Sequence, residues 1–194
     1  MSRATSHKLM AMLVVLSAAL TACESGNATD PARSDTLAAS ANFNGQQLDE
    51  LRKVTAKFHQ LDAAKQAGYD AQITPCWAHH SAGAMGYHYG KVALLDATVD
   101  LLEPEVVMYE PQGRTPMRLV GMEYIVPIAA WQAAGHDLNN PTDVPELLGQ
   151  KYTRHSFLPI FKLHIWLWRD NPSGVFADWN PKVSCARADS TEVF

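Results

Sequence analysis

Histidine and glutamate residues within strand-like segments are the groups of this chain that could do chemistry. In the segment LHIWLW, strand alternation places His164 on one face with two tryptophans and leaves aliphatic residues on the other face. Both faces are apolar enough to be covered, so His164 is expected to point into the interior. In RLVGMEYIVP, Glu123 shares its face with apolar residues and a glycine. A buried imidazole or carboxylate needs hydrogen bonds, an opposite charge or a metal ion.

A third candidate, His88, lies in the glycine-rich segment GAMGYHYG. In an extended chain it shares its face with Gly86 and Gly90, which leave room beside the imidazole for a ligand, a metal ion or another backbone segment. Two imidazoles and a carboxylate are typical ligands of zinc and of non-haem iron. We therefore predict that His88, Glu123 and His164 form a centre for one transition metal ion.

Further residues could complete or surround this centre. Glu110 ends the strand-like run VVMYE and is a candidate fourth ligand or catalytic acid–base group. Trp166 and Trp168, with His155, could line a pocket for an apolar or aromatic ligand, and Trp179 could extend it. The tryptophans are equally compatible with a place in the core.

Three interpretations of these residues stay open. They could bind a metal ion, line a metal-free ligand pocket, or form a structural network in which His164 bonds Glu123 and His88 packs in a turn. The chain has no H-E-x-x-H pair, no G-x-S-x-G elbow and no phosphate-binding glycine loop. The adjacent His79 and His80 are weaker ligand candidates because neighbouring side chains point in different directions.

The elements that would position these residues indicate an α+β domain. In GQQLDELRKVTAKFHQLDAAKQAG, apolar residues recur at intervals of three and four, which predicts an amphipathic helix that Asn44 can cap and Gly68 can end. Strand-like runs and turns follow it. We expect one N-terminal helix packed on a curved antiparallel sheet or a partly closed barrel.

The first residues predict export. Arg3 and Lys8 precede a short apolar run that ends in LTAC, which is typical of a signal peptide over residues 1–22. Leu-Thr-Ala before Cys23 also resembles the bacterial lipobox, and this resemblance implies lipidation of Cys23. A lipid anchor would hold the protein on a membrane surface of the cell envelope without spanning the membrane.

The region after the anchor predicts a tether and a single domain. Residues 23–43 are small and polar, which indicates a flexible tether, and residues 44–194 are long enough for one globular domain with its own core. Without Arg3 and Lys8, the mature chain keeps 14 of the 16 Lys and Arg residues against 20 acidic residues, a formal charge of −6. With no basic run, nothing indicates nucleic-acid binding.

Cys76 and Cys185 are the remaining cysteines. In an oxidising compartment such a pair is expected to form a disulfide, here across 109 positions. The alternative is a metal site that uses both thiolates. A disulfide would bring the last segment of the chain close to the region of the histidines.

Several segments carry a family resemblance. AAKQAGY, GAMGYHYGK, PEVVMYEPQG, RLVGMEYIVP and LHIWLWRDNPSGVFADWNPKVSC resemble blocks shared by a family of exported bacterial proteins of unknown activity, and they extend from about Leu48 to Cys185. The resemblance implies that these blocks belong to one domain, and it implies no mechanism.

Two functional classes are therefore expected. In the first, an exported lipoprotein domain uses a His/Glu metal centre to act on a small extracytoplasmic molecule. In the second, the domain is a non-catalytic lipoprotein of the envelope that binds a small ligand or has a structural role.

Overall fold

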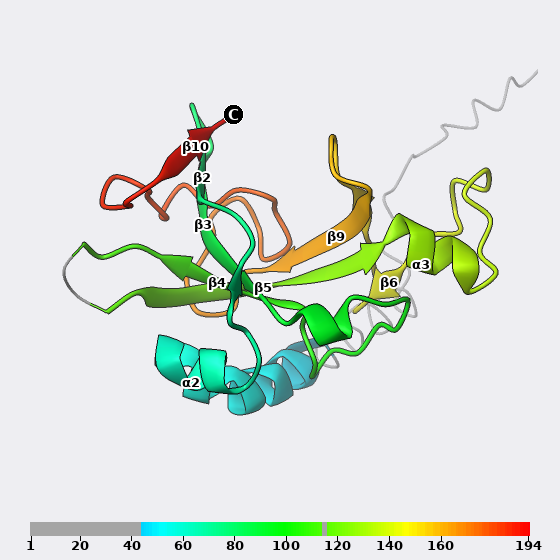
Figure 1. Cartoon of the computed structure of the whole chain (residues 1–194), viewed down its shortest axis with the longest axis horizontal. Helices are drawn as coiled ribbons and strands as arrows, with labels where there is room; N and C mark the ends of the chain where they lie inside the picture. Colours follow the sequence, from blue (N-terminus) through cyan, green and yellow to red (C-terminus); the bar gives the residue numbers. More distant parts are fainter. Residues whose placement is uncertain (1–43, 114–115) are drawn as a thin grey trace, which may run out of the picture.

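The computed structural model describes residues 44–113 and 116–194 (Figure 1). The predicted signal peptide, the tether and the lipidation site at Cys23 lie outside these residues. The predicted α+β class is confirmed: a sheet curls into a half-barrel, and helical segments pack against it. Among the described residues, the helices lack the length and hydropathy that a membrane crossing requires.

The main sheet has eight strands in the order β10-β2-β3-β4-β5-β9-β8, and β1 pairs with β3. Its strands are β1 (Ala71–Gln72), β2 (Cys76–His79), β3 (Gly83–Gly90), β4 (Val106–Glu110), β5 (Arg118–Pro127), β8 (Thr153–Arg154), β9 (Ile160–Ile165) and β10 (Thr191–Val193). Neighbouring strands pair in antiparallel fashion except for β10 and β2, which are parallel. A separate hairpin consists of β6 (Glu146–Leu147) and β7 (Gln150–Lys151).

The helical segments include residues 44–55, the 3-10 helix η1 (Ala56–His59) and α2 (Leu61–Gln66), all before the first strand. The sequence predicts one helix through this region, whereas the structure interrupts it at Gln60, which has an extended backbone. Two hydrogen bonds explain the interruption. The Thr55 hydroxyl donates to Leu51 O, a bond that disturbs helices, and the Tyr109 hydroxyl donates to Phe58 O, which would otherwise accept within the helix.

The end of this helical region agrees with the predicted stop signal. Gly68 has a φ of +98°, and the N–H of Tyr69 donates back to Ala64 O. This geometry is typical of a glycine just after a helix C-terminus. The later helical segments are η2 (Val92–Leu94) and α3 (Ile128–Ala133).

The helices before β1 cover one face of the sheet, and the chain after β9 runs over the other (Figure 1). Along β3 and β5, adjacent residues point to opposite faces. Tyr89 and Tyr124 are therefore on the helix-covered face, while His88 and Glu123 are on the loop-covered face. The Tyr89 ring contacts Tyr109, whose hydroxyl reaches η1.

A disulfide joins β2 to the loop-covered side. Cys76 and Cys185 are bonded with an S–S distance of 2.05 Å, which confirms the predicted disulfide. The bond fixes the segment after β9 over the same face that carries His88 and Glu123. This segment also contributes Asn180, which is buried and exchanges backbone hydrogen bonds with Ala84 of β3.

Candidate metal centre

Three adjacent regions of the sheet supply the candidate ligands. Glu123 of β5 and His164 of β9 are direct neighbours in the antiparallel register. His88 of β3 pairs with Met108 of β4, so its side chain reaches across β4 toward Glu123. The three side chains are buried, with relative exposures of 1% for His88, 4% for Glu123 and 1% for His164. The structure thus brings together all three predicted metal ligands.

The distances in this group suit metal ligands better than hydrogen bonds. His164 Nε2 lies 3.4 Å from one Glu123 oxygen, and His88 Nε2 lies 3.7 Å from the other. Hydrogen bonds between nitrogen and oxygen are usually about 2.7–3.2 Å long. Two ligands of one tetrahedral ion, with bonds of about 2.0–2.1 Å, are separated by roughly 3.3–3.4 Å. One ligand atom from each residue can be chosen so that all three lie within 4.8 Å of one another.

The imidazole nitrogens that face Glu123 lack partners. Among the described residues, His88 Nε2 and both ring nitrogens of His164 are buried without a hydrogen bond. A buried polar atom left in this state costs about 1–3 kcal/mol. A cation held between the two rings and Glu123 would satisfy the two inward-facing nitrogens. The group can therefore hold a metal ion.

Burial dominates the electrostatics of this group. It lowers the pKa of His88 to about 3, and the proximity of His164, His155 and Lys162 acts in the same direction. Burial also raises the pKa of Glu123 above its ordinary value, an effect that His164 and Lys162 oppose. Neutral imidazoles are the form that binds metal ions.

Each candidate ligand histidine has a polar group behind it. His88 Nδ1 lies 2.8 Å from the Thr74 hydroxyl, and His164 Nδ1 lies 3.4 Å from Asp178 without the alignment of a hydrogen bond. The proximity of His164 and of Lys162, which forms an ion pair with Asp178, keeps the pKa of the Asp178 carboxyl well below its usual range. Partners of this kind orient metal-binding imidazoles and select the nitrogen that faces the metal.

Glu110 is not part of this group. Its carboxylate accepts hydrogen bonds from the Ser184 backbone and from Arg118. The strand register explains the separation: Val106 is the residue of β4 opposite Glu123, and Glu110 lies four residues further along the strand. At about 3.3 Å per residue, that offset is about 13 Å.

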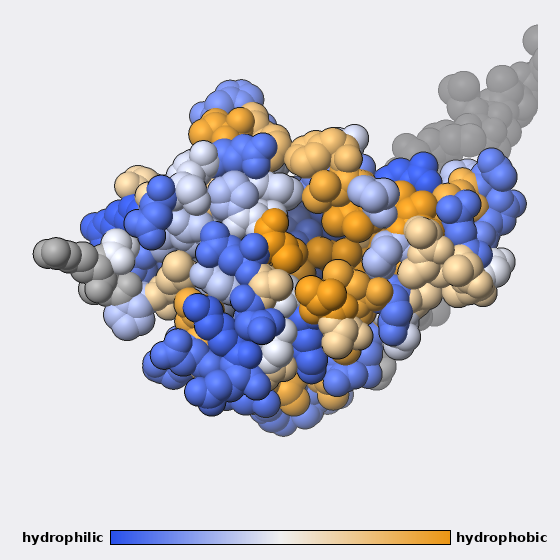
Figure 2. All heavy atoms as spheres, viewed as in Figure 1, coloured by the Kyte–Doolittle hydropathy of each residue, from blue (hydrophilic) through white to orange (hydrophobic). Residues whose placement is uncertain are grey.

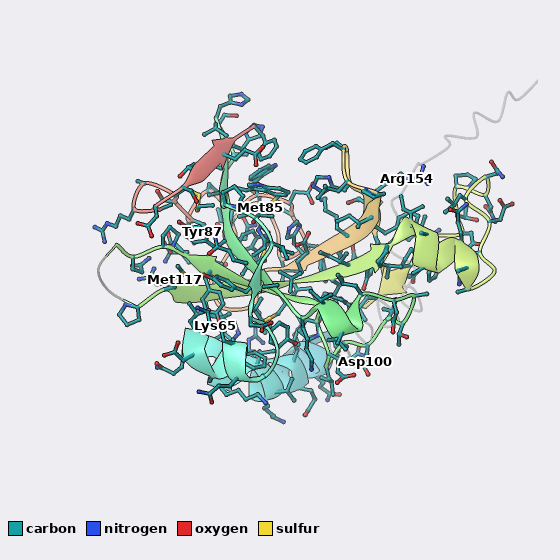
Figure 3. All side chains as sticks on the ribbon, viewed as in Figure 1. Lys65, Met85, Tyr87, Asp100, Met117 and Arg154 are labelled. Atoms are coloured by element: carbon teal, nitrogen blue, oxygen red, sulfur yellow. A yellow bond between two sulfur atoms is a disulfide. The ribbon has the colours of Figure 1, made fainter. Side chains whose placement is uncertain are left out.

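The glycines beside His88 accommodate neighbouring parts of the chain. A Cβ atom on Gly86 would lie 2.4 Å from the Tyr109 carbonyl oxygen, and one on Gly90 would lie 3.3 Å from the Ile73 side chain. Gly86 also has a φ of +91°, which interrupts strand alternation. Met85 and Tyr87 accordingly lie to different sides of β3 (Figure 3).

A cavity of about 220 Å³ lies beside the group, between β2, the loop before β9 and the segment around residue 178. Its lining includes the predicted His155, together with Trp77, Phe157, Lys162, Asp178 and Trp179. Figure 2 shows apolar side chains around a recess near the middle of this side of the molecule, and Met85, a further lining residue, lies between β3 and β9 in Figure 3.

Trp166 and Trp168, the other predicted pocket residues, do not line this cavity. The Trp166 indole donates to Ala177 O, and the Trp168 ring packs edge-on against His59 at 4.4 Å. The His164 and Trp166 rings lie 6.3 Å apart and nearly parallel, so the predicted common face extends to Trp166. The strand β9 ends at Ile165, and the alternation does not extend to Trp168.

Sequence reasoning missed Thr74, Trp77, Lys162 and the contact of Asp178 with His164. Asp178 lies in a segment whose proline, glycine and asparagine residues indicate local turns, so its pattern suggests only a turn role. Trp77 directly follows Cys76, so the expected Cys76–Cys185 disulfide is the sequence feature from which its position near the site could have been inferred.

No protein-family model matches this chain, and comparisons with curated proteins and with solved structures find no match either. The function must therefore be inferred from the geometry. Two histidines and one carboxylate leave coordination positions open on zinc or iron, which is the arrangement of catalytic sites.

Proposed function

We propose that this protein is an exported, lipid-anchored domain whose His88–Glu123–His164 group binds one transition metal ion, zinc or iron. The centre then acts on a small extracytoplasmic molecule. One observation carries the proposal: three buried side chains converge at ligand-to-ligand distances, and the imidazole nitrogens that face Glu123 lack hydrogen-bond partners among the described residues.

The reaction class follows from the ligand set. A bound zinc ion would activate water for hydrolysis, whereas iron with the same ligands would support oxidation. The surrounding residues support the centre: Thr74 contacts His88 Nδ1 at hydrogen-bonding distance, Asp178 lies 3.4 Å behind His164 Nδ1, and Lys162 forms an ion pair with Asp178. Asp178 is half-exposed and also lines the cavity, so it connects the buried group to the space where a small molecule can enter.

Metal analysis of the full-length protein, purified without chelator, tests the centre. We expect about one zinc or iron ion per wild-type chain and loss of that ion in His88→Ala and His164→Ala. The matched control is His80→Ala, because His80 is exposed and lies outside the group. Circular dichroism on each variant separates loss of metal from loss of fold. A wild-type protein without stoichiometric metal would overturn the proposal.

The anchoring part of the proposal is supported by the basic start, the apolar run and the LTAC segment before Cys23. Mass spectrometry of the exported protein should show a chain that begins at an acylated Cys23. Cys23→Ala should move the protein from the membrane fraction to the soluble fraction. An unmodified cysteine in the exported wild type would contradict the anchor.

A non-catalytic role in ligand binding is the second candidate. The aromatic lining of the cavity and the complete burial of the three metal ligands favour it. Under this alternative the protein binds a small molecule without turnover, and replacing the candidate metal ligands leaves its ligand affinity unchanged.

A further inference from the structure

The cavity beside the candidate metal centre is lined by aromatic side chains that could pack against a flat ring. Trp77, Phe157, Trp179 and Phe194 line it, and the Phe194 ring lies 5.2 Å from Trp77, 5.6 Å from Phe157 and 5.9 Å from Trp179. A dry cavity of roughly 150 Å³ can hold benzene. At about 220 Å³, this cavity has room for one ring and one small substituent.

The polar groups of the cavity are mainly hydrogen-bond donors. His79 Nδ1 accepts the N–H groups of Ser81 and Ala82, and His155 Nδ1 accepts that of Leu158. A neutral imidazole whose Nδ1 accepts carries its proton on Nε2, which becomes the donor. Burial lowers the pKa of His155, so this ring is neutral at pH 7.

The strongest donor is the Lys162 ammonium group. Its side chain is 7% exposed, and it forms an ion pair with Asp178. The same Asp178 oxygen faces His164 Nδ1 and Lys162. Lys162 has three N–H donors, so it can bind a second acceptor in the cavity while it keeps Asp178.

Charge favours an anionic ligand once the centre holds its ion. The charges of Lys162 and Asp178 cancel, and a divalent ion with ionised Glu123 leaves one net positive charge. In a partly enclosed cavity the effective dielectric is lower than in bulk water, so this charge attracts a carboxylate more strongly there than in open solvent. This part of the argument rests on the metal centre proposed above.

We propose that this cavity binds a small aromatic carboxylate, with its ring among Trp77, Phe157 and Trp179 and its carboxylate on Lys162. The molecule would thereby lie next to Asp178 and the His164 side of the metal centre. This inference assigns a substrate class to the proposed function.

Titration calorimetry of the full-length protein with benzoate tests the assignment. Two comparison compounds separate the two recognition features: cyclohexanecarboxylate keeps the charge but is not flat, and benzyl alcohol keeps the ring but is neutral. We expect one benzoate per chain and at least tenfold weaker binding of both comparison compounds. Absence of benzoate binding, or equal binding of all three compounds, would overturn the proposal.

Variants locate the binding site. Lys162→Met should weaken benzoate binding at least tenfold, whereas Lys151→Met, a change at an exposed lysine of β7, should leave it unchanged. Because Lys162→Met leaves Asp178 unpaired and could impair folding, Trp179→Ala provides a second test and should also weaken binding at least tenfold. Wild-type affinity in a folded Lys162→Met or Trp179→Ala protein would overturn the assignment.

Metal content measured on the same samples keeps the two proposals distinguishable. A protein that holds its metal ion but does not bind benzoate would refute the aromatic-carboxylate site and retain the metal centre. A metal-free protein that binds benzoate through Lys162 and Trp179 would refute the metal centre and support the cavity assignment.

Discussion

On the face of the sheet that packs against the helices, buried tyrosine hydroxyls find partners within the chain. Tyr109 donates to Phe58 O at 2.6 Å, and Tyr124 donates to Leu101 O at 2.6 Å. On the opposite face, His88 and His164 are equally buried, yet their nitrogens that face Glu123 have no partner among the described residues. Among the described residues, both of these tyrosine hydroxyls are satisfied within the chain, whereas the nitrogens that face Glu123 are not. On the helix side, Gln47 Oε1 and Trp168 Nε1 are also buried without a partner, but neither faces a second candidate metal ligand.

The contrast arises from neighbouring residues in the same strands. Glu123 and Tyr124 are adjacent in β5, and alternation sends one to each face. Buried polar groups therefore affect stability differently on the two faces. A buried hydroxyl with a hydrogen-bond partner adds about 1 kcal/mol to the free energy of unfolding, whereas a buried polar group without a partner lowers it. The metal centre proposed above depends on this difference.

The largest expected loss of stability follows from removing the disulfide that joins the segment over the loop-covered face to β2. The Cys76–Cys185 bond spans 109 positions, and a loop of this length corresponds to about 4–5 kcal/mol in the chain-entropy model. Replacing both cysteines by alanine should lower the free energy of unfolding by about this amount in urea titrations. Amide hydrogen exchange should accelerate over residues 175–190 more than over the helices; a uniform acceleration would contradict a specific role for the bond on this face.

The second prediction concerns the contribution of Glu105 to the pH dependence of the free energy of unfolding. Burial raises the pKa of Glu105 from 4.5 to about 8, although its carboxylate accepts the Ile125 N–H. Between these pH values the native protein binds more protons than the unfolded chain, so stability falls as the pH rises. At about 1.4 kcal/mol per pH unit, the loss over this window of about 3.5 pH units is on the order of 5 kcal/mol.

Urea unfolding at several values between pH 4.5 and 8 measures this slope. Glu105→Gln is the matched variant, because its amide oxygen can still accept the Ile125 N–H while the titrating proton is gone. The variant should show a flatter profile. An unchanged slope in Glu105→Gln would assign the pH dependence to other groups.

The third prediction tests whether the hydrogen bond of the Tyr109 hydroxyl, on the helix-covered face, stabilises the fold. Tyr109→Phe removes a hydroxyl from a fully buried side chain and leaves the Phe58 carbonyl without its donor. We expect a loss of about 1–3 kcal/mol in the free energy of unfolding. A neutral effect would mean that this hydroxyl is not part of the packing that stabilises the fold.

The smallest expected loss of stability is for the corresponding substitution on the loop-covered face, at His164. His164→Leu in metal-free protein removes nitrogens that have no hydrogen-bond partner among the described residues, and Asp178 keeps its ion pair with Lys162. The free energy of unfolding should fall by less than about 1 kcal/mol or rise, because unsatisfied buried nitrogens are themselves unfavourable, while metal binding is lost. A loss as large as that of Tyr109→Phe would show that His164 is satisfied within the chain and would remove the contrast between the faces.

Part of the candidate site was predictable because strand alternation depends on local sequence alone. His164, Glu123 and His88 occupy positions where a period of two places a polar group among covered residues, and the structure brings them together. Glu110 follows the same rule but lies in a different part of the face, because the register of β4 against β5 separates it from Glu123. Register depends on pairing between distant segments, which no local pattern reveals.

Local sequence patterns are sufficient to predict the α+β class, the helix stop at Gly68, the Cys76–Cys185 pair and the inward direction of His88, Glu123 and His164. These features depend on residue type and short-range geometry. The tertiary structure alone decided that Asp178 lies behind His164, that Trp77 rather than Trp166 walls the cavity, and that Glu110 binds Ser184. Those contacts join residues that are distant in the chain, and their positions follow from the curl of the sheet and the path of the disulfide-linked segment over it.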